Sequence, residues 1–240
     1  MFFIFVLHKF AFQLQIYTQH KEGSFTMGGF MESDFVDMFE SLGAIIRGGH
    51  FRYSSGLHGS VYINKMAIFK IEDIAYRLCR EITAQFKDDS ISLVIGPAVG
   101  GSIMSRFTAE AITRNSRKFK ISSTLVHAVS ADKTSNEKFV IASEFNELIC
   151  ERRVLVVDDV LNTGASLKKV IALVREAMGV VVGVGTFFNR GGITKKDLDV
   201  PKLYSLVDMK LEAWPKDICA MCKEGVPMNT EFGSGKILTQ

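Results

Sequence analysis

Two adjacent aspartates, Asp158 and Asp159, end an apolar run, RVLVVDD (153–159). A loop of small and hydroxyl-bearing residues follows and opens a helical pattern; its members are Asn162, Thr163, Gly164, Ala165 and Ser166. Backbone N–H groups at the beginning of a helix, helped by hydroxyls, suit a phosphate monoester. The two carboxylates would repel that phosphate, but they can accept hydrogen bonds from sugar hydroxyls or hold a hydrated Mg²⁺. We therefore predict a sugar phosphate across the end of this strand, with its phosphate on the loop and its hydroxyls on the acids.

The simplest alternative for this segment is an acidic turn that caps a helix. A lone Asp-Asp pair would favour it, but the order of strand, Asp-Asp, three residues, Thr-Gly-x-Ser and helix favours the sugar-phosphate interpretation. A P-loop needs a glycine-flanked Lys-Ser/Thr, which the sequence lacks. Gly183 and Gly185 form only a fragment of a dinucleotide fingerprint inside an apolar run, so we discount it.

Two other loops after apolar runs carry residues suited to anions. The run SLVIG (92–96) leads into a glycine loop that contains Ala98, Val99, Gly100 and Gly101. Glycines let backbone amides approach an oxyanion closely, although they also permit tight packing of a strand against a helix. Arg190 follows a later apolar run, and its planar fork of donors suits a carboxylate. An arginine after a strand is otherwise a solvated surface residue.

These loops need a sheet to position them, and the apolar runs provide one. The predicted strands are SLVIG (92–96), STLVHAV (123–129), RVLVVDD (153–159), VVVGVGTFF (180–188) and KLYSLVD (202–208). Near-continuous apolar strands that alternate with helical patterns predict an α/β fold, a parallel sheet flanked by helices. Such sheets bind ligands beyond the carboxyl ends of their strands, where the loops above lie.

The segment before the sheet predicts a small N-terminal hood, at about 34–66. Apolar residues at helical spacing predict a helix from Ser33 that ends at Gly48-Gly49; they are Phe35, Met38, Phe39, Leu42 and Ile45. A turn, SSGLHGS, then leads to a short strand, VYIN (61–64). A second amphipathic helix follows, marked by Ile74, Leu78, Ile82 and Phe86.

We divide the chain into an N-terminal extension of uncertain role, 1–30, and one domain, 31–240, that includes the hood and a C-terminal tail. The extension begins with an apolar, aromatic stretch that is too short to span a membrane and has no signal-peptide pattern. It could be a surface-lying amphipathic anchor, a docking segment or a stretch upstream of the true start. The net charge of +3 gives no reason to expect nucleic acid as a partner, and we expect a cytoplasmic protein that makes no membrane contact.

The segment VVDDVLNTGAS (156–166) closely resembles the motif with which type I phosphoribosyltransferases bind 5-phosphoribosyl 1-diphosphate (PRPP). Further segments are similar to the orotate phosphoribosyltransferase branch; they are HFRYSSGLHGSVYIN (50–64), IGPAVGGS (95–102), FFNRGG (187–192) and CAMCKEGVP (219–227). The resemblance covers about 34–230. It implies transfer of phosphoribose from PRPP to orotate, giving orotidine 5′-monophosphate and pyrophosphate. It also implies Mg²⁺ carried by the substrate without a firm protein ligand, and a homodimer.

The resemblance also implies roles for single residues. Asp158 and Asp159 would contact the ribose hydroxyls, and the phosphate would lie on the loop. The PRPP site comprises the two acids, Val160, Leu161, Asn162, Thr163, Gly164, Ala165, Ser166, Lys133 and Lys138. The pyrophosphate would lie on Ala98, Val99, Gly100 and Gly101, with a strained peptide near Val99. Orotate would contact Arg190, Asn162, Ser55 and Gly56.

A polar segment after the strand 123–129, VSADKTSNEKF, corresponds to a mobile catalytic loop of the family. A lysine of this loop closes over the departing pyrophosphate, often in the neighbouring subunit's site. Lys133 matches it best and Lys138 second, although either could serve only solubility. The catalytic set implied by the resemblance is thus Lys133, Asp158 and Asp159.

Several departures from the family pattern weaken orotate specificity. Position 54, where many orotate enzymes have lysine, is a serine, and Arg52 and Lys65 are candidates to replace that contact. Asn162 stands where a threonine often touches the base, and the mobile segment is poor in basic residues. The alternatives are a phosphoribosyltransferase for another base, such as a purine, and a non-catalytic PRPP-sensing regulator.

The four cysteines include one Cys-x-x-Cys, Cys219 and Cys222, and no second such pair that could complete a zinc site. We expect reduced structural thiols; a metal shared between subunits is the alternative. Cys79 is expected in the core. His50 and His58 flank the N-terminal turn, where His58 could contact substrate or be structural.

Overall fold

A six-stranded sheet forms the centre of the computed structural model, which describes residues 31–53, 55–118, 126–134, 136 and 138–233. The strand order is β5-β4-β3-β6-β7-β8, and every neighbouring pair is parallel except β4 with β5. The strands are β3 (Leu93–Pro97), β4 (His127–Lys133), β5 (Phe139–Val140), β6 (Arg153–Leu161), β7 (Val180–Asn189) and β8 (Leu203–Asp208). The predicted α/β fold is confirmed.

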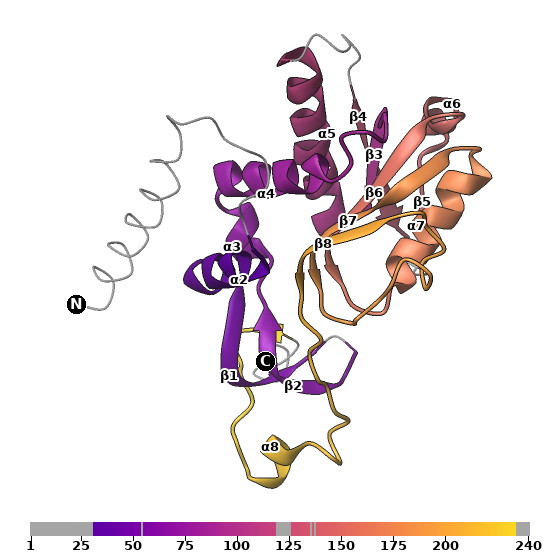
Figure 1. Ribbon diagram of the computed structural model, residues 1–240. Helices are drawn as coiled ribbons and strands as arrows, with labels where there is room; N and C mark the ends of the chain where they lie inside the picture. Colours follow the sequence, from indigo (N-terminus) through magenta and orange to yellow (C-terminus); the bar gives the residue numbers. More distant parts are fainter. Residues whose placement is uncertain (1–30, 54, 119–125, 135, 137, 234–240) are drawn as a thin grey trace, which may run out of the picture.

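Helices cover both faces of this sheet (Figure 1). The long ones are α4 (Glu72–Ala84), α5 (Gly100–Lys118) and α7 (Ala165–Glu176), and short turns lie at η1 (Ser143–Phe145) and α6 (Asn146–Ile149). Successive strand residues point to opposite faces. Val94 and Leu155 therefore share one apolar core with α4 and α5, whereas Ile95 and Val156 share a second core with α7. Burial on both faces explains why the strand sequences are almost continuously apolar.

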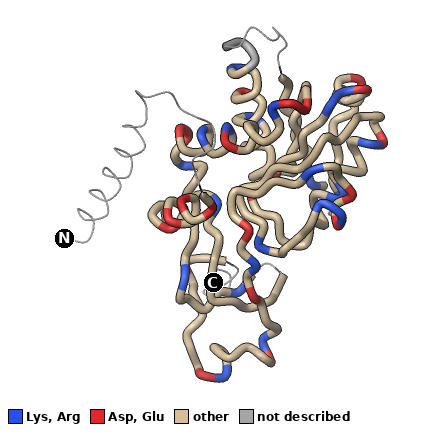
Figure 2. The backbone as a smooth tube through the Cα atoms, in the orientation of Figure 1, with Lys and Arg blue, Asp and Glu red and all other residues tan. Residues whose placement is uncertain are grey.

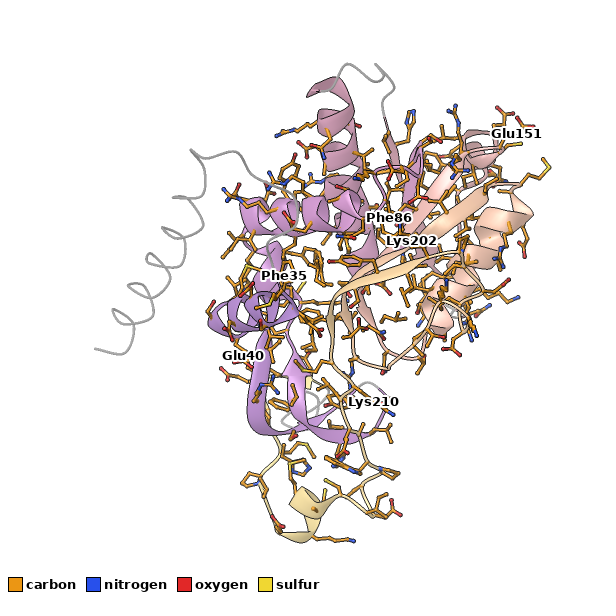
Figure 3. All side chains as sticks on the ribbon, in the orientation of Figure 1. Phe35, Glu40, Phe86, Glu151, Lys202 and Lys210 are labelled. Atoms are coloured by element: carbon orange, nitrogen blue, oxygen red, sulfur yellow. The ribbon has the colours of Figure 1, made fainter. Side chains whose placement is uncertain are left out.

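The glycines of β7 serve this packing. A methyl group added to Gly185 would lie 2.5 Å from the Ile82 side chain of α4, and one added to Gly183 would lie 2.6 Å from Phe86. Figure 3 shows Phe86 beside Lys202 where α4 meets the sheet, and the Lys202 Nζ lies 4.8 Å from the centre of the Phe86 ring. The two glycines lie inside a strand, as predicted, and they permit close packing of α4 on the sheet.

A separate two-stranded antiparallel sheet, β1 (Ile45–Arg52) with β2 (His58–Ile63), forms the hood together with α2 (Glu32–Ser41). The short helix α3 (Met66–Phe69) follows it, and α8 (Ala220–Lys223) belongs to the tail that lies against the hood (Figure 1). Phe39 of α2 packs on Phe188 of β7 with ring centres 4.4 Å apart. The hood is therefore fixed to the sheet near the carboxyl end of β7.

The first helix is shorter than its sequence pattern predicts. It ends at Ser41, and Gly43 adopts a positive φ of 69° directly after the C-cap. Ile45 then pairs with Ile63 as the first residue of β1, and Gly48-Gly49 lie within that strand at a bulge. The prediction that the helix continues to Gly48 is wrong, because Gly43 turns the chain out of the helix while Ile45 still keeps helical spacing.

The polar segment after 123–129 is also more regular than predicted. β4 continues to Lys133 and pairs with Phe139-Val140 of β5, so much of the predicted mobile loop is a hairpin. The predicted strand 123–129 falls partly outside the described residues, as does the whole extension 1–30. The strand predicted at 61–64 begins earlier, at His58.

Within the described part of the chain, we find no helix with both the length and the apolar character to cross a membrane. Figure 2 shows basic and acidic positions interspersed over the sheet domain and the hood. An anionic ligand would therefore be held by local groups.

Candidate active site

The aspartate pair lies at the carboxyl end of β6, between β3 and β7. Asp158 is half-buried and stands opposite Thr186 of β7, whereas the Asp159 side chain is almost fully buried. The backbone N–H of Asp159 donates to Oδ1 of Asp158 over 2.9 Å. The predicted position of both acids, at the edge where parallel sheets bind ligands, is confirmed.

Lys65, which follows β2 of the hood, reaches this edge. Its Nζ lies 3.0 Å from Oδ2 and 3.2 Å from Oδ1 of Asp159. Lys65 was one of the two candidates for the missing lysine contact, and the structure places it on a site acid. The hood thus supplies a cation to the end of β6.

The acids lie in surroundings that oppose their charge. Burial raises the pKa of Asp158 well above its usual value, and the neighbouring Asp159 raises it further. Burial likewise raises the pKa of Asp159, while Lys65 lowers it in part. For Lys65, burial opposes the ammonium charge, but the two aspartates outweigh it and its pKa is raised. The two carboxyl groups therefore share the partial compensation that Lys65 provides.

This charge balance predicts a pH-dependent effect of Asp158→Asn on stability. Because the folded-state pKa of Asp158 is raised, its ionisation destabilises the folded protein above that pKa. The effect fades as the pH falls toward the ordinary aspartate pKa, where both states are protonated. We expect the variant to unfold at higher urea concentration than the wild type at pH 8 and at a similar concentration near pH 4. An equal difference at both pH values would contradict the assignment.

The glycine loop after β3 lies directly against the acids. A methyl group added to Gly100 would overlap Oδ2 of Asp159, at 1.4 Å. Gly100 is the first residue of α5, so the loop offers the N-terminus of a 19-residue helix. The Ala98–Val99 peptide is cis, at the place where the family resemblance implied an unusual peptide. Val99 is exposed, and the Ala98 N–H donates to the Ala131 carbonyl of β4.

The loop after β6 opens α7, as predicted. Gly164 is its N-cap and has a positive φ of 76°, a conformation that favours glycine. The flanking loop residues are exposed at the helix N-terminus; they are Asn162, Thr163, Ala165 and Ser166. Thr163 Oγ1 accepts a hydrogen bond from the Ala165 N–H. The other exposed groups of this turn face solvent, where a phosphate could meet them.

The loop after β7 packs on the loop after β6. A methyl group on Gly191 would lie 1.6 Å from the Asn162 carbonyl oxygen, so only glycine permits this approach. The Arg190 N–H donates to the Leu161 carbonyl over 2.9 Å. Asn189 braces the turn, since its side-chain amide donates to Ile193 O and Asp208 Oδ1. Arg190 is therefore held beside the predicted phosphate loop.

The guanidinium of Arg190 lies over the ring of Tyr53, 4.2 Å from its centre. Its Nε is buried without a hydrogen-bond partner among the described residues. The Tyr53 hydroxyl donates to the Val61 carbonyl, and burial raises the Tyr53 pKa although Arg190 lowers it in part. The N–H of Gly56, in the turn that also holds Ser55, donates to the Tyr53 carbonyl. Ser55 and Gly56, the orotate-site residues predicted in the hood, thus lie in the same turn as Tyr53, on whose ring Arg190 stacks.

Comparisons with known proteins agree with this arrangement. Residues 59–219 match the phosphoribosyl transferase domain family. The orotate phosphoribosyltransferase of Caldanaerobacter subterraneus subsp. tengcongensis is 37% identical over 208 residues, which are 86% of this chain and 100% of that relative. The chain belongs to the orotate phosphoribosyltransferase family. A second member, from Pelotomaculum thermopropionicum, is 33% identical over 204 residues, 85% of this chain and 98% of that relative.

A solved structure of the orotate phosphoribosyltransferase family shares the fold. The crystal structure of the enzyme from Aeropyrum pernix matches with a TM-score of 0.56 and 25% identity. The match covers 73% of this chain and 94% of that chain. Family membership therefore rests on sequence and structure together.

In this member of the orotate phosphoribosyltransferase family, the two predicted loop lysines lie on the hairpin of β4 and β5. Lys133 is the last residue of β4 and Lys138 precedes β5, and both are exposed. The Thr134 N–H donates to the Lys138 carbonyl, which closes the hairpin. The hairpin nevertheless leaves the sheet beside the glycine loop, since Ala131 accepts from Ala98. Their catalytic role stays a prediction.

Sequence reasoning missed Tyr53 as a site residue. Its signal was weak: a single aromatic residue before the Ser-Ser-Gly turn. Only the fold shows that this turn reaches the end of β7.

Proposed function

We propose that this protein transfers the phosphoribosyl group of PRPP to orotate, giving orotidine 5′-monophosphate and pyrophosphate. The bond from ribose C1 to a pyrophosphate oxygen breaks, and a bond from C1 to a ring nitrogen of orotate forms. That nitrogen gives up its proton to the departing pyrophosphate or to solvent. One observation carries the proposal: the loops after β3, β6 and β7 meet at one edge, with Gly100 against Asp159 and Gly191 against Asn162. Three anion-suited loops in contact match a substrate with a phosphate, a diol and a pyrophosphate.

Each part of PRPP has a matching group. Exposed amides and hydroxyls of 162–166, at the N-terminus of α7, suit the 5-phosphate. Asp158 and Asp159 suit the ribose hydroxyls, which donate hydrogen bonds to carboxylates. The N-terminus of α5 and the loop 98–101 suit the pyrophosphate. The ribose would thus lie between the N-termini of α5 and α7, with its hydroxyls bonded to Asp158 and Asp159.

Arg190 supports an acidic base as acceptor. Its guanidinium is fixed on Tyr53, and its buried Nε has a donor to offer. A carboxylate satisfies such a planar fork well, and orotate carries one whereas uracil and the purines do not. Asn162, Ser55 and Gly56 lie on the loops that flank this arginine and would complete the base site.

Mg²⁺ fits this site through the substrate. One oxygen of each carboxylate has a hydrogen-bond partner: Asp158 Oδ1 accepts from the Asp159 N–H, and Asp159 Oδ1 accepts from Lys65 Nζ. Oδ2 of Asp159 is buried without a hydrogen bond among the described residues, although Lys65 Nζ lies 3.0 Å away. Mg²⁺ commonly keeps water and substrate phosphate as ligands, which requires few protein oxygens. When bound, it would neutralise charge on the pyrophosphate, while Asp158 and Asp159 would hold the hydroxyls of the ribose. A homodimer and a cytoplasmic location are likewise predictions.

A comparison of acceptor bases is the most discriminating test of this function. Purified full-length protein would be assayed with PRPP, Mg²⁺ and, in turn, orotate, uracil, hypoxanthine and adenine. We expect turnover with orotate alone. Arg190→Gln should raise KM for orotate about 10–150-fold, because a charged hydrogen bond contributes about 1.5–3 kcal/mol.

Arg152→Gln, at an exposed arginine before β6, is the matched control and should leave KM unchanged. Turnover with a purine and none with orotate would identify a phosphoribosyltransferase for another base. PRPP binding without turnover on any base would identify a regulator. Either result would overturn the proposal.

A further inference from the structure

Four metal-ligating side chains meet at the interface between the hood and the tail, away from the aspartate pair. His50 lies on β1 and His58 begins β2, whereas Cys219 is the N-cap of α8 and Cys222 lies within that helix. One ligand atom from each residue lies within 4.8 Å of the other three. Three of the side chains are buried and Cys222 is partly buried. Only Cys219 and Cys222 form a ligand pattern in the sequence, because the two histidines are far from them along the chain.

We propose that His50, His58, Cys219 and Cys222 bind one Zn²⁺ within each chain, and that this structural site fastens the tail to the hood. Two thiolates and two neutral imidazoles are a common tetrahedral zinc set. The thiolates would balance the charge of the ion, which removes the cost of burying an isolated cation.

The distances fit a tetrahedral ion. Zn–N bonds of about 2.0–2.1 Å and Zn–S bonds of about 2.3 Å place neighbouring ligand atoms roughly 3.3–3.8 Å apart. Here Cys219 Sγ and Cys222 Sγ lie 3.7 and 3.6 Å from His50 Nε2. His58 Nδ1 lies 3.2 Å from Cys222 Sγ and 3.0 Å from His50 Nε2. Changes in the separations of single pairs of ligand atoms would bring the four atoms to the corners of a tetrahedron around the ion.

Hydrogen bonding at His50 favours a cation over an all-protein network. His50 Nδ1 lies 2.8 Å from the Val226 carbonyl, which can only accept, so Nδ1 carries the proton of the neutral ring. Nε2 therefore has one lone pair, yet His58 and both cysteines approach it. The lone pair of Nε2 can accept a hydrogen bond from only one of these three groups. One metal ion, in contrast, can bind all four side chains at once. A backbone carbonyl on the far nitrogen is also the usual support of a zinc-bound histidine.

The zinc site would add a second link between the hood and the tail, which backbone hydrogen bonds already join. His58 and Trp214 exchange two backbone hydrogen bonds of 2.8 Å, and the Asn229 N–H donates to the His50 carbonyl. The tail thus crosses the hood on both sides of the cluster. The same hood carries Tyr53, so the ion would stiffen the element on which Arg190 rests.

Metal content of the full-length protein tests the site. After growth with zinc and dialysis into metal-free buffer, we expect about one zinc per chain by mass spectrometry of the metal. The Cys219→Ser, Cys222→Ser double variant should lose it, and Cys150→Ser, at a cysteine outside the cluster, should keep it. Replacement by Co²⁺ should give the d–d absorption of a tetrahedral ion together with thiolate-to-cobalt charge transfer.

Three results would overturn the proposal. The first is wild-type protein that retains less than about a tenth of an equivalent of zinc and shows no thiolate–cobalt absorption. The second is a double variant that binds zinc as the wild type does. The third is about half an equivalent per chain, which would indicate an ion shared between two chains. The cobalt spectrum of the wild type tests the site even where the double variant fails to fold. None of these measurements depends on the transferase activity.

Discussion

Replacing Lys133 by alanine is expected to lower kcat about 10²–10³-fold, with a much smaller effect on KM for PRPP. The proposed reaction builds negative charge on the departing pyrophosphate, so a nearby cation contributes most in the transition state. Lys133 ends β4, whose Ala131 carbonyl bonds the glycine loop on which the pyrophosphate would lie. Steady-state kinetics with orotate and PRPP would measure the effect.

Two other lysines give the controls for this prediction. Lys138→Ala, across the hairpin, should lower kcat less, because it is the second candidate. Lys87→Ala removes the same charge at an exposed position between α4 and the amino end of β3, whereas the site loops follow the carboxyl ends of the strands, and it should leave kcat unchanged. If Lys133→Ala and Lys87→Ala had equal kcat values, the lysine of the hairpin would have no catalytic role.

Asp159→Asn should weaken PRPP binding by about 1–3 kcal/mol, or about 5–150-fold, while the protein stays folded. The amide has a donor NH2 in place of one carboxylate oxygen, so it cannot accept ribose hydroxyls at both positions as a carboxylate does, and it loses the ion pair with Lys65. Burial raises the pKa of Asp159, so a neutral amide suits this buried position and the variant should fold. Calorimetric titration with PRPP and Mg²⁺ would measure the affinity.

The matched control is Asp89→Asn. Asp89 also pairs with a lysine, Lys202, over 3.2 Å, but at the other end of the sheet strands. This variant removes one comparable ion pair and should bind PRPP as the wild type does. Unchanged PRPP affinity in Asp159→Asn would contradict the sugar-site assignment.

The sheet and its site loops could be predicted because local sequence determines them. Strands buried on both faces need continuous apolar runs, and the glycine and hydroxyl residues that follow them mark the loops. β6 begins at Arg153 and contains Asp158 and Asp159 as predicted, although it continues two residues further, to Leu161. The loop opens a helix as predicted, and α7 begins at Ala165, within the predicted loop.

The hood could not be predicted in the same way because long-range contacts shape it. Ile45 keeps helical spacing, yet it pairs with Ile63 in a strand. β5 is only two residues long and depends on β4 for its hydrogen bonds. The stacking of Tyr53 on Arg190 joins segments that no local pattern relates. Pairing partners distant in sequence leave no periodic signal, so only the fold shows them.

The hood, near the N-terminal end of the described chain, forms hydrogen bonds with the tail, near its C-terminal end, as the bonds of His58 with Trp214 and of His50 with Asn229 show. A growing polypeptide leaves the ribosome N-terminal part first, and its domains fold in that direction. β1 and β2 are therefore synthesised long before the tail that completes them. A prematurely terminated chain could contain β6 and its acids but would lack the tail, so the hydrogen bonds that join β1 and β2 to the tail form only at the end of translation.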